Sequence, residues 1–536
     1  MGGRLSSVNM IHNHTPGFSV ACWRAPPKEG EHPMSTIETA RAPARRSTQL
    51  FRSSINFFHI VFMVTAAAAP LVVVSTYIPI GFSNGAGMAT PLIYALTTVI
   101  LLIFTVGFAQ MAKRITSAGA FYTFTVHGLG RHVGLGAGFT ILASYSMISA
   151  AIAGGFGFYA SALLSQYFAL SVAWYWCSIV GLALMYLISF FRVTVGARIL
   201  AVLLSLEVMV VLIVCVATVV SGGSSGQVGA AFNPSELGVA PAIGIGFFLA
   251  FWSWIGFETT AIYGEETADP KRSVPRATYI AVATLGIVYT FAAYAGIVGF
   301  GADSPAKAGK LVNAYYFQLA DNYSFHFVRT LMNFLVVSGF FACAFAFHNN
   351  AARYFYSLGR DGILPRALGR THPRHKSPHV AAATQAVVAI VTVAVFALGG
   401  ADPLLQLATW LPIFCTFGVI LVQLLVSLAV IRYFNRVGRE GRKGVLKTWV
   451  APLLGAVAQL VVIILLMQNL TFLAGSNLLA VKLIPLYVAV IAVAGVVYAA
   501  WLRSRHPKRF AAIGMLHDEE LEELFVDEMY VEEGYK

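Results

Sequence analysis

Two long runs of the chain, residues 53–112 and residues 132–191, contain no Asp, Glu, Lys or Arg. The hydrocarbon core of a bilayer is crossed by about 20 residues of helix, so each run is long enough for two membrane spans. Turn-forming residues at 81–87 divide the first run, and residues 165–171 divide the second. The pattern therefore predicts four membrane-spanning helices in these two runs.

Further apolar segments predict eight more spanning helices. They lie at about 199–221, 241–265, 276–300, 328–357, 380–400, 404–432, 449–473 and 479–502. The whole pattern predicts an all-α membrane protein with twelve transmembrane helices within residues 53–503. We expect residues 1–52, which are polar and basic, to form a disordered tail, and residues 504–536 to form a second, acidic tail.

Composition excludes a soluble protein. Hydrophobic residues make up 58% of the chain and charged residues only 11%, whereas soluble chains are about 25% charged.

If the N-terminus is cytosolic, cytosolic loops carry twenty Lys and Arg residues and external loops carry four: Lys307, Lys310, Arg329 and Lys482. Cytosolic loops are normally the basic ones. We expect a multi-pass protein of the cytoplasmic membrane with both termini cytosolic, and the net charge of +13 then requires no nucleic-acid partner.

Two of the predicted helices, the first and the sixth, are interrupted. In the first, Pro70 lies within Ala68, Ala69, Pro70, Leu71 and Val72, and it removes a backbone donor. In the sixth, Gly256 ends the run Phe251, Trp252, Ser253, Trp254, Ile255 and Gly256. The two helices correspond if helices 1–5 and 6–10 are repeats, and broken helices at matching positions indicate a transporter binding site near the bilayer midplane. These eleven residues are the predicted substrate-binding residues.

Two acids lie within predicted spans, Glu207 in the fifth and Glu258 in the sixth. Ionisable residues inside a membrane are costly and face the protein interior, where a lone carboxyl group favours its protonated form. We predict that Glu207, together with Glu258, carries the coupling proton. For each acid the alternative is a structural role, bonded to the backbone of a broken helix. His59 and His348 are interpreted as packing residues. The five cysteines show no ligand spacing, so we expect no metal ion and no cofactor.

Four segments resemble the amino acid–polyamine–organocation permease superfamily. They are Gly107–Tyr122, Phe251–Glu258 with the exit Glu265–Arg276, Arg353–Arg366, and His372–Pro378. The resemblance covers roughly residues 55–510. It implies a LeuT-like 5+5 inverted repeat, with repeats at about 55–221 and 241–433, broken helices 1 and 6, and helices 11 and 12 at about 449–502. The first helix departs from the family pattern, which usually has Gly-Ser-Gly-like residues where this chain has Ala68-Ala69-Pro70-Leu71.

The resemblance implies alternating-access transport of an amino acid or a related amine. It places the helix-6 break in the substrate pocket, with Trp252 or Trp254 covering the ligand. It also places Glu207 where some members carry a lysine beside a vestigial sodium site. We expect the substrate carboxylate to meet amides at 69–72 and its ammonium to meet carbonyls at 251–255.

Proton-coupled uptake is the favoured function. Sodium coupling is less supported, because helix 8 offers only Thr330 and Ser338 as hydroxyl ligands. An exchanger or exporter of the same fold is the alternative, and a membrane-embedded enzyme is a remote one, since the ionisable residues within the spans lie on separate helices. The acidic stretch at 517–525 either docks on basic loops or is a solvated tail.

Overall fold

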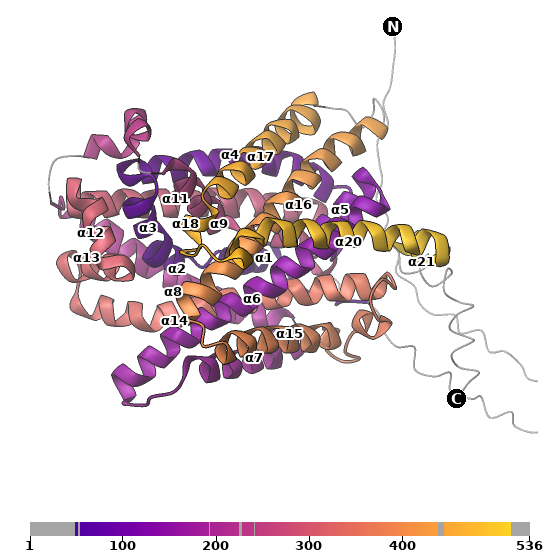
Figure 1. Ribbon diagram of the computed structural model, residues 1–536, viewed down its shortest axis with the longest axis horizontal. Helices are drawn as coiled ribbons and strands as arrows, with labels where there is room; N and C mark the ends of the chain where they lie inside the picture. Colours follow the sequence, from indigo (N-terminus) through magenta and orange to yellow (C-terminus); the bar gives the residue numbers. More distant parts are fainter. Residues whose placement is uncertain are drawn as a thin grey trace, which may run out of the picture. The chain divides into compact units, whose positions relative to one another are not determined.

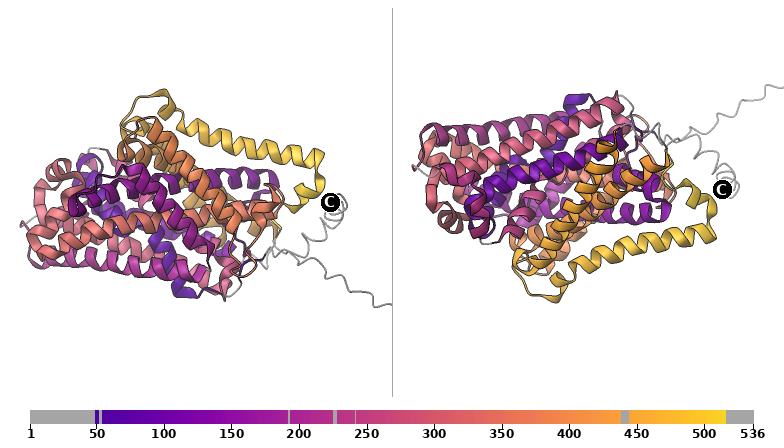
Figure 2. Two further views of the ribbon diagram at one scale, coloured as in Figure 1. Left: turned by 90° about the horizontal axis from the view of Figure 1, so that it is seen from below. Right: turned by 90° about the horizontal axis from the view of Figure 1, so that it is seen from above.

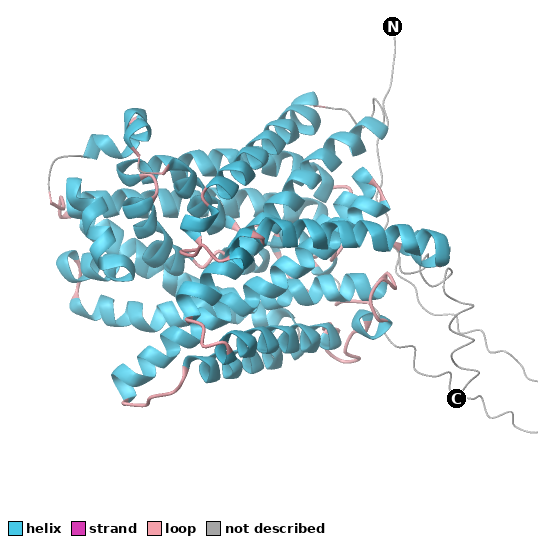
Figure 3. Cartoon of the chain, viewed as in Figure 1, coloured by secondary structure: helices cyan, strands magenta, loops and turns pink. Residues whose placement is uncertain are grey.

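The computed structural model describes residues 49–51, 54–191, 193–224, 228–240, 242–437 and 444–515. The expectations about the N-terminal tail and the acidic stretch at 517–525 therefore lie outside the described residues. Within the described ranges the chain is helical almost throughout (Figure 3), and the only strand-like pairing is an isolated bridge between Ile55 and Thr267.

The first half of the bundle contains the first interrupted helix and the long helices that follow it. Its helices are α1 (Phe57–Ala67), α2 (Pro70–Val72), α3 (Ile78–Asn84), α4 (Thr90–Ala112), α5 (Ala120–Leu129), α6 (Arg131–Phe168), α7 (Trp174–Phe190) and α8 (Val193–Val220). The central part contains α9 (Ile243–Trp254), α10 (Thr259–Ile262), α11 (Pro270–Phe300), α12 (Ser304–Leu311), α13 (Tyr315–Tyr323) and α14 (His326–Arg360).

The remaining helices are α15 (His379–Leu398), α16 (Ala408–Arg436), α17 (Ala451–Gln468), α18 (Leu470–Leu473), α19 (Leu479–Lys482), α20 (Ile484–Arg505) and α21 (Pro507–Ala512). Three π-helical segments are η1 (Val73–Tyr77), η9 (Pro403–Leu407) and η10 (Leu446–Val450). Short 3-10 segments are η2 (Gly87–Ala89), η3 (Val228–Phe232), η4 (Pro234–Val239), η5 (Gly264–Glu266), η6 (Gly301–Asp303), η7 (Val312–Ala314) and η8 (Arg366–Gly369).

Eleven helical stretches in the described ranges are long and apolar enough to cross a membrane. A shorter apolar helix, α7, has 17 residues and coincides with the second predicted span of residues 132–191. The chain is thus a multi-pass helical membrane protein, as predicted, while the count of twelve and the inverted repeat stay predictions. The helix α11 contains the predicted span at about 276–300 and begins earlier, at Pro270, because proline is compatible with the first turn of a helix.

The interrupted helices lie inside the bundle. In the most apolar part of the stretch Ile243–Ile262, 94% of the residues are buried. In the most apolar part of α20, 22% of the residues are buried. The long helices α6 and α14 pack along each other, and α7 packs against α15 (Figure 1). Figure 2 shows α20 and α21 along one side of the bundle. From Leu486 to Trp501 the exposed side chains of α20 are apolar, which suits contact with lipid; they include Leu486, Val490, Val493, Val497 and Trp501.

Candidate functional site

The first helix breaks where the sequence predicts. The helix α1 ends at Ala67, Ala69 adopts a left-handed conformation with φ 43°, and Pro70 begins α2. The break exposes two carbonyl oxygens, and both receive a donor from another helix. The Cys343 thiol in α14 donates to the Ala67 carbonyl at 2.9 Å, and the Tyr289 hydroxyl in α11 donates to the Ala68 carbonyl at 2.9 Å.

The sixth helix also breaks at the predicted place. The helix α9 ends at Trp254, Gly256 has φ +111°, and α10 begins at Thr259. The Gly256 N–H donates to Glu258 Oε2 at 3.1 Å, and the Tyr145 hydroxyl in α6 donates to Glu258 Oε1. Both Glu258 carboxylate oxygens are therefore bonded within the protein. These contacts tie Glu258 to the break, and its predicted role in proton coupling stays a prediction.

The two breaks touch each other. A β-carbon built on Gly256 would lie 2.8 Å from the Ala67 β-carbon, closer than real β-carbons approach. The eleven predicted lining residues are all buried. The structure therefore brings the two predicted segments to one place in the interior of the bundle.

The aromatic residues around the breaks form two groups. Trp252 makes an edge contact with Tyr77, with ring centroids 6.1 Å apart. Trp254 contacts Tyr289 at 5.2 Å and Tyr94 at 5.8 Å, and the two tyrosine rings are 5.9 Å apart. The Tyr94 hydroxyl also lies 3.2 Å from Ser253 Oγ. Sequence reasoning named the tryptophans but missed Tyr94 and Tyr289, because it could not assign the faces of their helices.

Glu207 lies beside the first break. Its side chain is 2% exposed, and the Leu71 backbone is near enough to interact with its carboxyl group. A β-carbon built on Gly339 of α14 would lie 3.0 Å from Glu207 Oε2, so α14 presents bare backbone to this carboxyl. Oε2 has no hydrogen-bond partner in the described part of the chain. Glu207 therefore differs from Glu258 in having a free acceptor.

Several backbone groups at the breaks are already bonded within the protein. Pro70 has no N–H, and the Ala69 N–H donates to the Ala66 carbonyl. The Val73 N–H is bonded to the Ala69 carbonyl, and the Gly256 N–H is bonded to Glu258. The expectation that residues 69–72 hold a substrate carboxylate stays a prediction.

A buried ion pair between Arg353 and Glu266 lies at the end of the bundle that contains η5. Arg353 of α14 binds Glu266 through Nε–Oε1 at 2.9 Å and Nη2–Oε2 at 3.1 Å, and both side chains are 3% exposed. The guanidinium carbon lies 4.0 Å from the centroid of the Tyr263 ring. Burial raises the pKa of Glu266, although Arg353 opposes this shift. The sequence singled out the segments that contain these residues but assigned them no contact.

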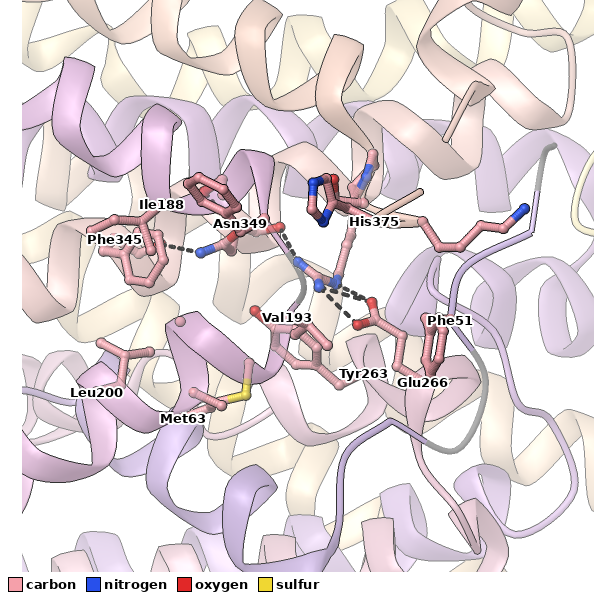
Figure 4. Close-up of a pocket in the computed structure, with 18 residues that line it drawn as sticks. Phe51, Met63, Ile188, Val193, Leu200, Tyr263, Glu266, Phe345, Asn349 and His375 are labelled. Carbon is pink, nitrogen blue, oxygen red and sulfur yellow. Dashed lines mark hydrogen bonds and ion pairs between the residues drawn. The ribbon is translucent and has the colours of Figure 1, made fainter. Parts of the chain in front are cut away.

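A pocket opens beside this ion pair (Figure 4). It is lined by Met63 of α1, Leu200 of α8, Phe345 and Asn349 of α14, and Glu266, among others. Leu200 precedes Glu207 by seven residues in α8, a rise of about 10 Å along a helix. Met63 lies one turn before Ala67. The pocket therefore lies beside the ion pair, and its lining ends about one turn of α1 before the first break.

A second pair, Arg360 with Glu265, adds two hydrogen bonds of 3.0 Å at the same end of the bundle.

The two histidines predicted to be packing residues, His59 and His348, differ in their surroundings. His59 caps α1 together with Asn56. His348 is fully buried, and neither ring nitrogen has a hydrogen-bond partner among the described residues. The described residues contain no cluster of three or more potential metal ligands.

Comparison with known proteins agrees with this arrangement. A family model described as "Amino acid permease" matches residues 55–499. The chain is 25% identical to the "Low-affinity putrescine importer PlaP" of Escherichia coli, over 72% of this chain and 81% of that protein. It is 23% identical to the "Branched-chain amino acid permease BcaP" of Bacillus subtilis, over 65% of this chain and 74% of that protein. It is also 27% identical to the "Uncharacterized transporter Rv1999c" of Mycobacterium tuberculosis, over 56% of this chain and 64% of that protein.

Proposed function

Since the chain belongs to the amino acid permease family, and is therefore a transporter rather than an enzyme, we propose that it is a secondary active transporter that works by alternating access. Its substrate is an amino acid or a related amine, which it moves across the cytoplasmic membrane. Relatives named for putrescine and for branched-chain amino acids support both substrate classes. The matched region covers most of the predicted transporter domain.

The observation that carries this proposal is the contact between two broken helices beside a buried carboxyl group. Broken helices expose backbone groups that can coordinate a polar substrate at membrane depth. Here Gly256 packs against Ala67, and the carboxyl of Glu207 lies at the same break through Leu71. A bundle that served only as a scaffold would gain nothing from interrupting both helices.

We assign proton coupling to Glu207. A coupling ion does work only by binding the two conformations of a transporter unequally. Glu207 lies between the first helix and α14, so movement of either helix changes its surroundings. The role of Glu258 as a second proton site stays a prediction. Glu258 is the weaker candidate, because both of its carboxylate oxygens already accept hydrogen bonds.

The direction of coupling has two candidates. The sequence favours uptake together with protons. Exchange or export is the second candidate, and the free Oε2 of Glu207 favours it, because a proton and a cationic substrate would compete for one acceptor.

The test is accumulation of labelled putrescine, ornithine and branched-chain amino acids in proteoliposomes under pH gradients of both signs. Protein-free vesicles control for passive redistribution of amines. Accumulation with the acidic side outside supports uptake with protons, and accumulation with the acidic side inside supports exchange. If the rate of substrate accumulation is the same under both pH gradients and without one, proton coupling is overturned. If none of the substrates accumulates, transport of this class is overturned. The variant Glu207→Gln should carry substrate only down its own gradient.

A further inference from the structure

We propose that the end of α7 and the start of α8 hold a phospholipid with an anionic headgroup. Arg374, His375 and Lys376, in the loop at residues 372–377, bind the headgroup, and the apolar faces of the two helices hold the acyl chains. The site lies away from the helix breaks and goes beyond the proposed function. Its occupant comes from the leaflet on that side of the membrane, which is the cytosolic leaflet in the predicted orientation.

An open pocket lies between the end of α7 and the start of α8. It has a volume of about 210 Å³ and is lined by Phe191, Val195, Arg374 and His375. Among these described residues two are apolar, two carry nitrogen donors, and none is an acid. Phe191 and His375 also line the pocket beside the buried ion pair (Figure 4). The lining therefore suits a ligand that combines a negative charge with an apolar part.

The loop that supplies the basic groups is held in one shape by its own backbone. The His372 N–H donates to the Ser377 carbonyl, and the Lys376 N–H donates to the His372 carbonyl, both at 2.8 Å. His372 Nδ1 accepts from the N–H groups of Arg374 at 3.3 Å and His375 at 3.1 Å. Lys376 is left-handed, with φ 54°, a costly conformation that persists where the surrounding structure fixes it. Three successive basic residues are thus presented by a preformed loop.

Contacts with the end of α7 fix this loop beside the pocket. The Ser377 hydroxyl donates to the Phe190 carbonyl at 2.7 Å. The Phe190 ring lies 4.7 Å from the His372 ring, and the Phe191 ring lies 5.5 Å from the His375 ring, measured between centroids. The basic groups and the apolar wall of the pocket therefore keep a defined spacing.

Two stripes of exposed apolar side chains start at the pocket and follow the membrane-spanning helices. The stripe towards α7 consists of Phe191, Leu187, Leu184, Val180 and Trp176, and the stripe on α8 consists of Val195, Val202, Leu206, Met209, Ile213 and Val216. Spacings of three, four or seven residues put each set on one face of its helix. Since both stripes start at residues that line the pocket, acyl chains along them would place a headgroup phosphate beside Arg374.

The charges around the pocket favour an anionic headgroup over a neutral one. Arg374 and Lys376 carry positive charges, and the His375 ring can donate a hydrogen bond. Among the described residues that line the adjoining pocket the one acid is Glu266, and Arg353 binds both of its oxygens. The cytosolic leaflet carries anionic lipids, and basic pockets between transmembrane helices on that side bind their headgroups. A free inorganic anion would use the loop but not the stripes, so we commit to a lipid.

The test titrates the full-length protein in detergent with phosphatidylglycerol, and separately with phosphatidylcholine of the same acyl chains. The lipid concentration that gives half of the maximal shift in melting temperature is the apparent affinity. Inorganic phosphate and glycerol 3-phosphate, at the same concentrations, supply the charge without acyl chains. We expect phosphatidylglycerol to bind about tenfold more tightly than phosphatidylcholine, or better, and the two anions without chains to give no shift.

Variants of the loop test which residues select the headgroup. Arg374→Gln should lose about fivefold in apparent affinity for phosphatidylglycerol and change little for phosphatidylcholine. Lys376→Gly should do the same while keeping the left-handed turn, which glycine adopts readily. Arg505→Gln is the matched control, because it removes the same charge from an exposed position in the last turn of α20. It should keep the full preference for phosphatidylglycerol.

Four results would each overturn the inference. They are equal affinities for the two lipids, a shift with inorganic phosphate equal to that with phosphatidylglycerol, an undiminished preference in both loop variants, and an equal loss in Arg505→Gln. The last result would mean that surface charge in general, and not this pocket, selects the lipid. If Arg374→Gln does not elute as a folded protein, Lys376→Gly and the comparison of headgroups on the wild type still decide.

Discussion

Gly256 of the sixth interrupted helix packs against Ala67 of the first, with no room for a side chain between them. Its φ of +111° is also a conformation that residues with a β-carbon rarely adopt. Gly256→Ala should therefore destabilise the protein by about 2 kcal/mol or more, through strain and overpacking. The melting temperature in detergent measures this loss. Gly238→Ala is the matched control, because a β-carbon there meets nothing within 4 Å, and an equal effect of both variants would contradict the contact.

Gly339→Ala tests the surroundings of Glu207 without removing its charge. The new β-carbon would lie 3.0 Å from Oε2 and 3.1 Å from the carboxyl carbon, so the carboxyl group must shift. We expect a several-fold loss of gradient-driven accumulation with a much smaller change in melting temperature. Gly229→Ala provides the control, since its β-carbon has open space. Unchanged accumulation by Gly339→Ala would show that the position of Glu207 is not critical.

Glu266→Gln leaves the Arg353 guanidinium buried without its counter-charge. Removing one partner of a buried ion pair typically costs about 3–5 kcal/mol, and both side chains here are 3% exposed. We expect a clear fall in melting temperature. Asp269→Asn breaks a 3.9 Å pair with Arg272 whose side chains are 55% and 78% exposed, and it should have little effect, because solvent screens such pairs. Equal melting temperatures for the two variants would contradict a stabilising role for the buried pair.

Asp361 should give the protein a measurable pH dependence. It follows α14, and its Oδ2 accepts hydrogen bonds from the Tyr122 hydroxyl at 2.7 Å and the Gly514 N–H at 2.9 Å. Burial raises the pKa of Asp361 from 3.8 to about 6, although Arg360 opposes this shift. Because the folded-state pKa is the higher one, stability is greatest below the unfolded-state pKa and falls as the pH rises through 6.

The measurement for Asp361 is the difference in stability between the wild type and Asp361→Asn at pH 5 and at pH 7.5. Relative to the variant, the wild type should be stabilised by about 1 kcal/mol on going from pH 7.5 to pH 5. The subtraction removes other titrating groups, such as His127, whose pKa is lowered by burial. A difference that does not change with pH, or changes in the opposite direction, would contradict this account of Asp361.

Sequence reasoning reached the helical membrane fold and both helix breaks, because hydropathy, Pro70 and Gly256 are local signals. It named Glu207 and Glu258 because an acid in an apolar run is conspicuous. It could not separate their surroundings, since Tyr145 beside Glu258 and Leu71 beside Glu207 lie far from them in the sequence. The aromatic trio was missed for the same reason: Tyr94 and Tyr289 resemble many other tyrosines until the helices are packed.

The most direct test of the account measures amine flux and lumenal pH together in one proteoliposome preparation. Labelled putrescine is added outside vesicles that hold wild-type protein and a pH-sensitive dye, with Glu207→Gln vesicles and protein-free vesicles alongside. If a proton and an ammonium alternate on Glu207, putrescine entry through the wild type should make the lumen more alkaline, and Glu207→Gln should show no such change. Wild-type putrescine entry without a change in lumenal pH, or the same change with Glu207→Gln, would contradict the account.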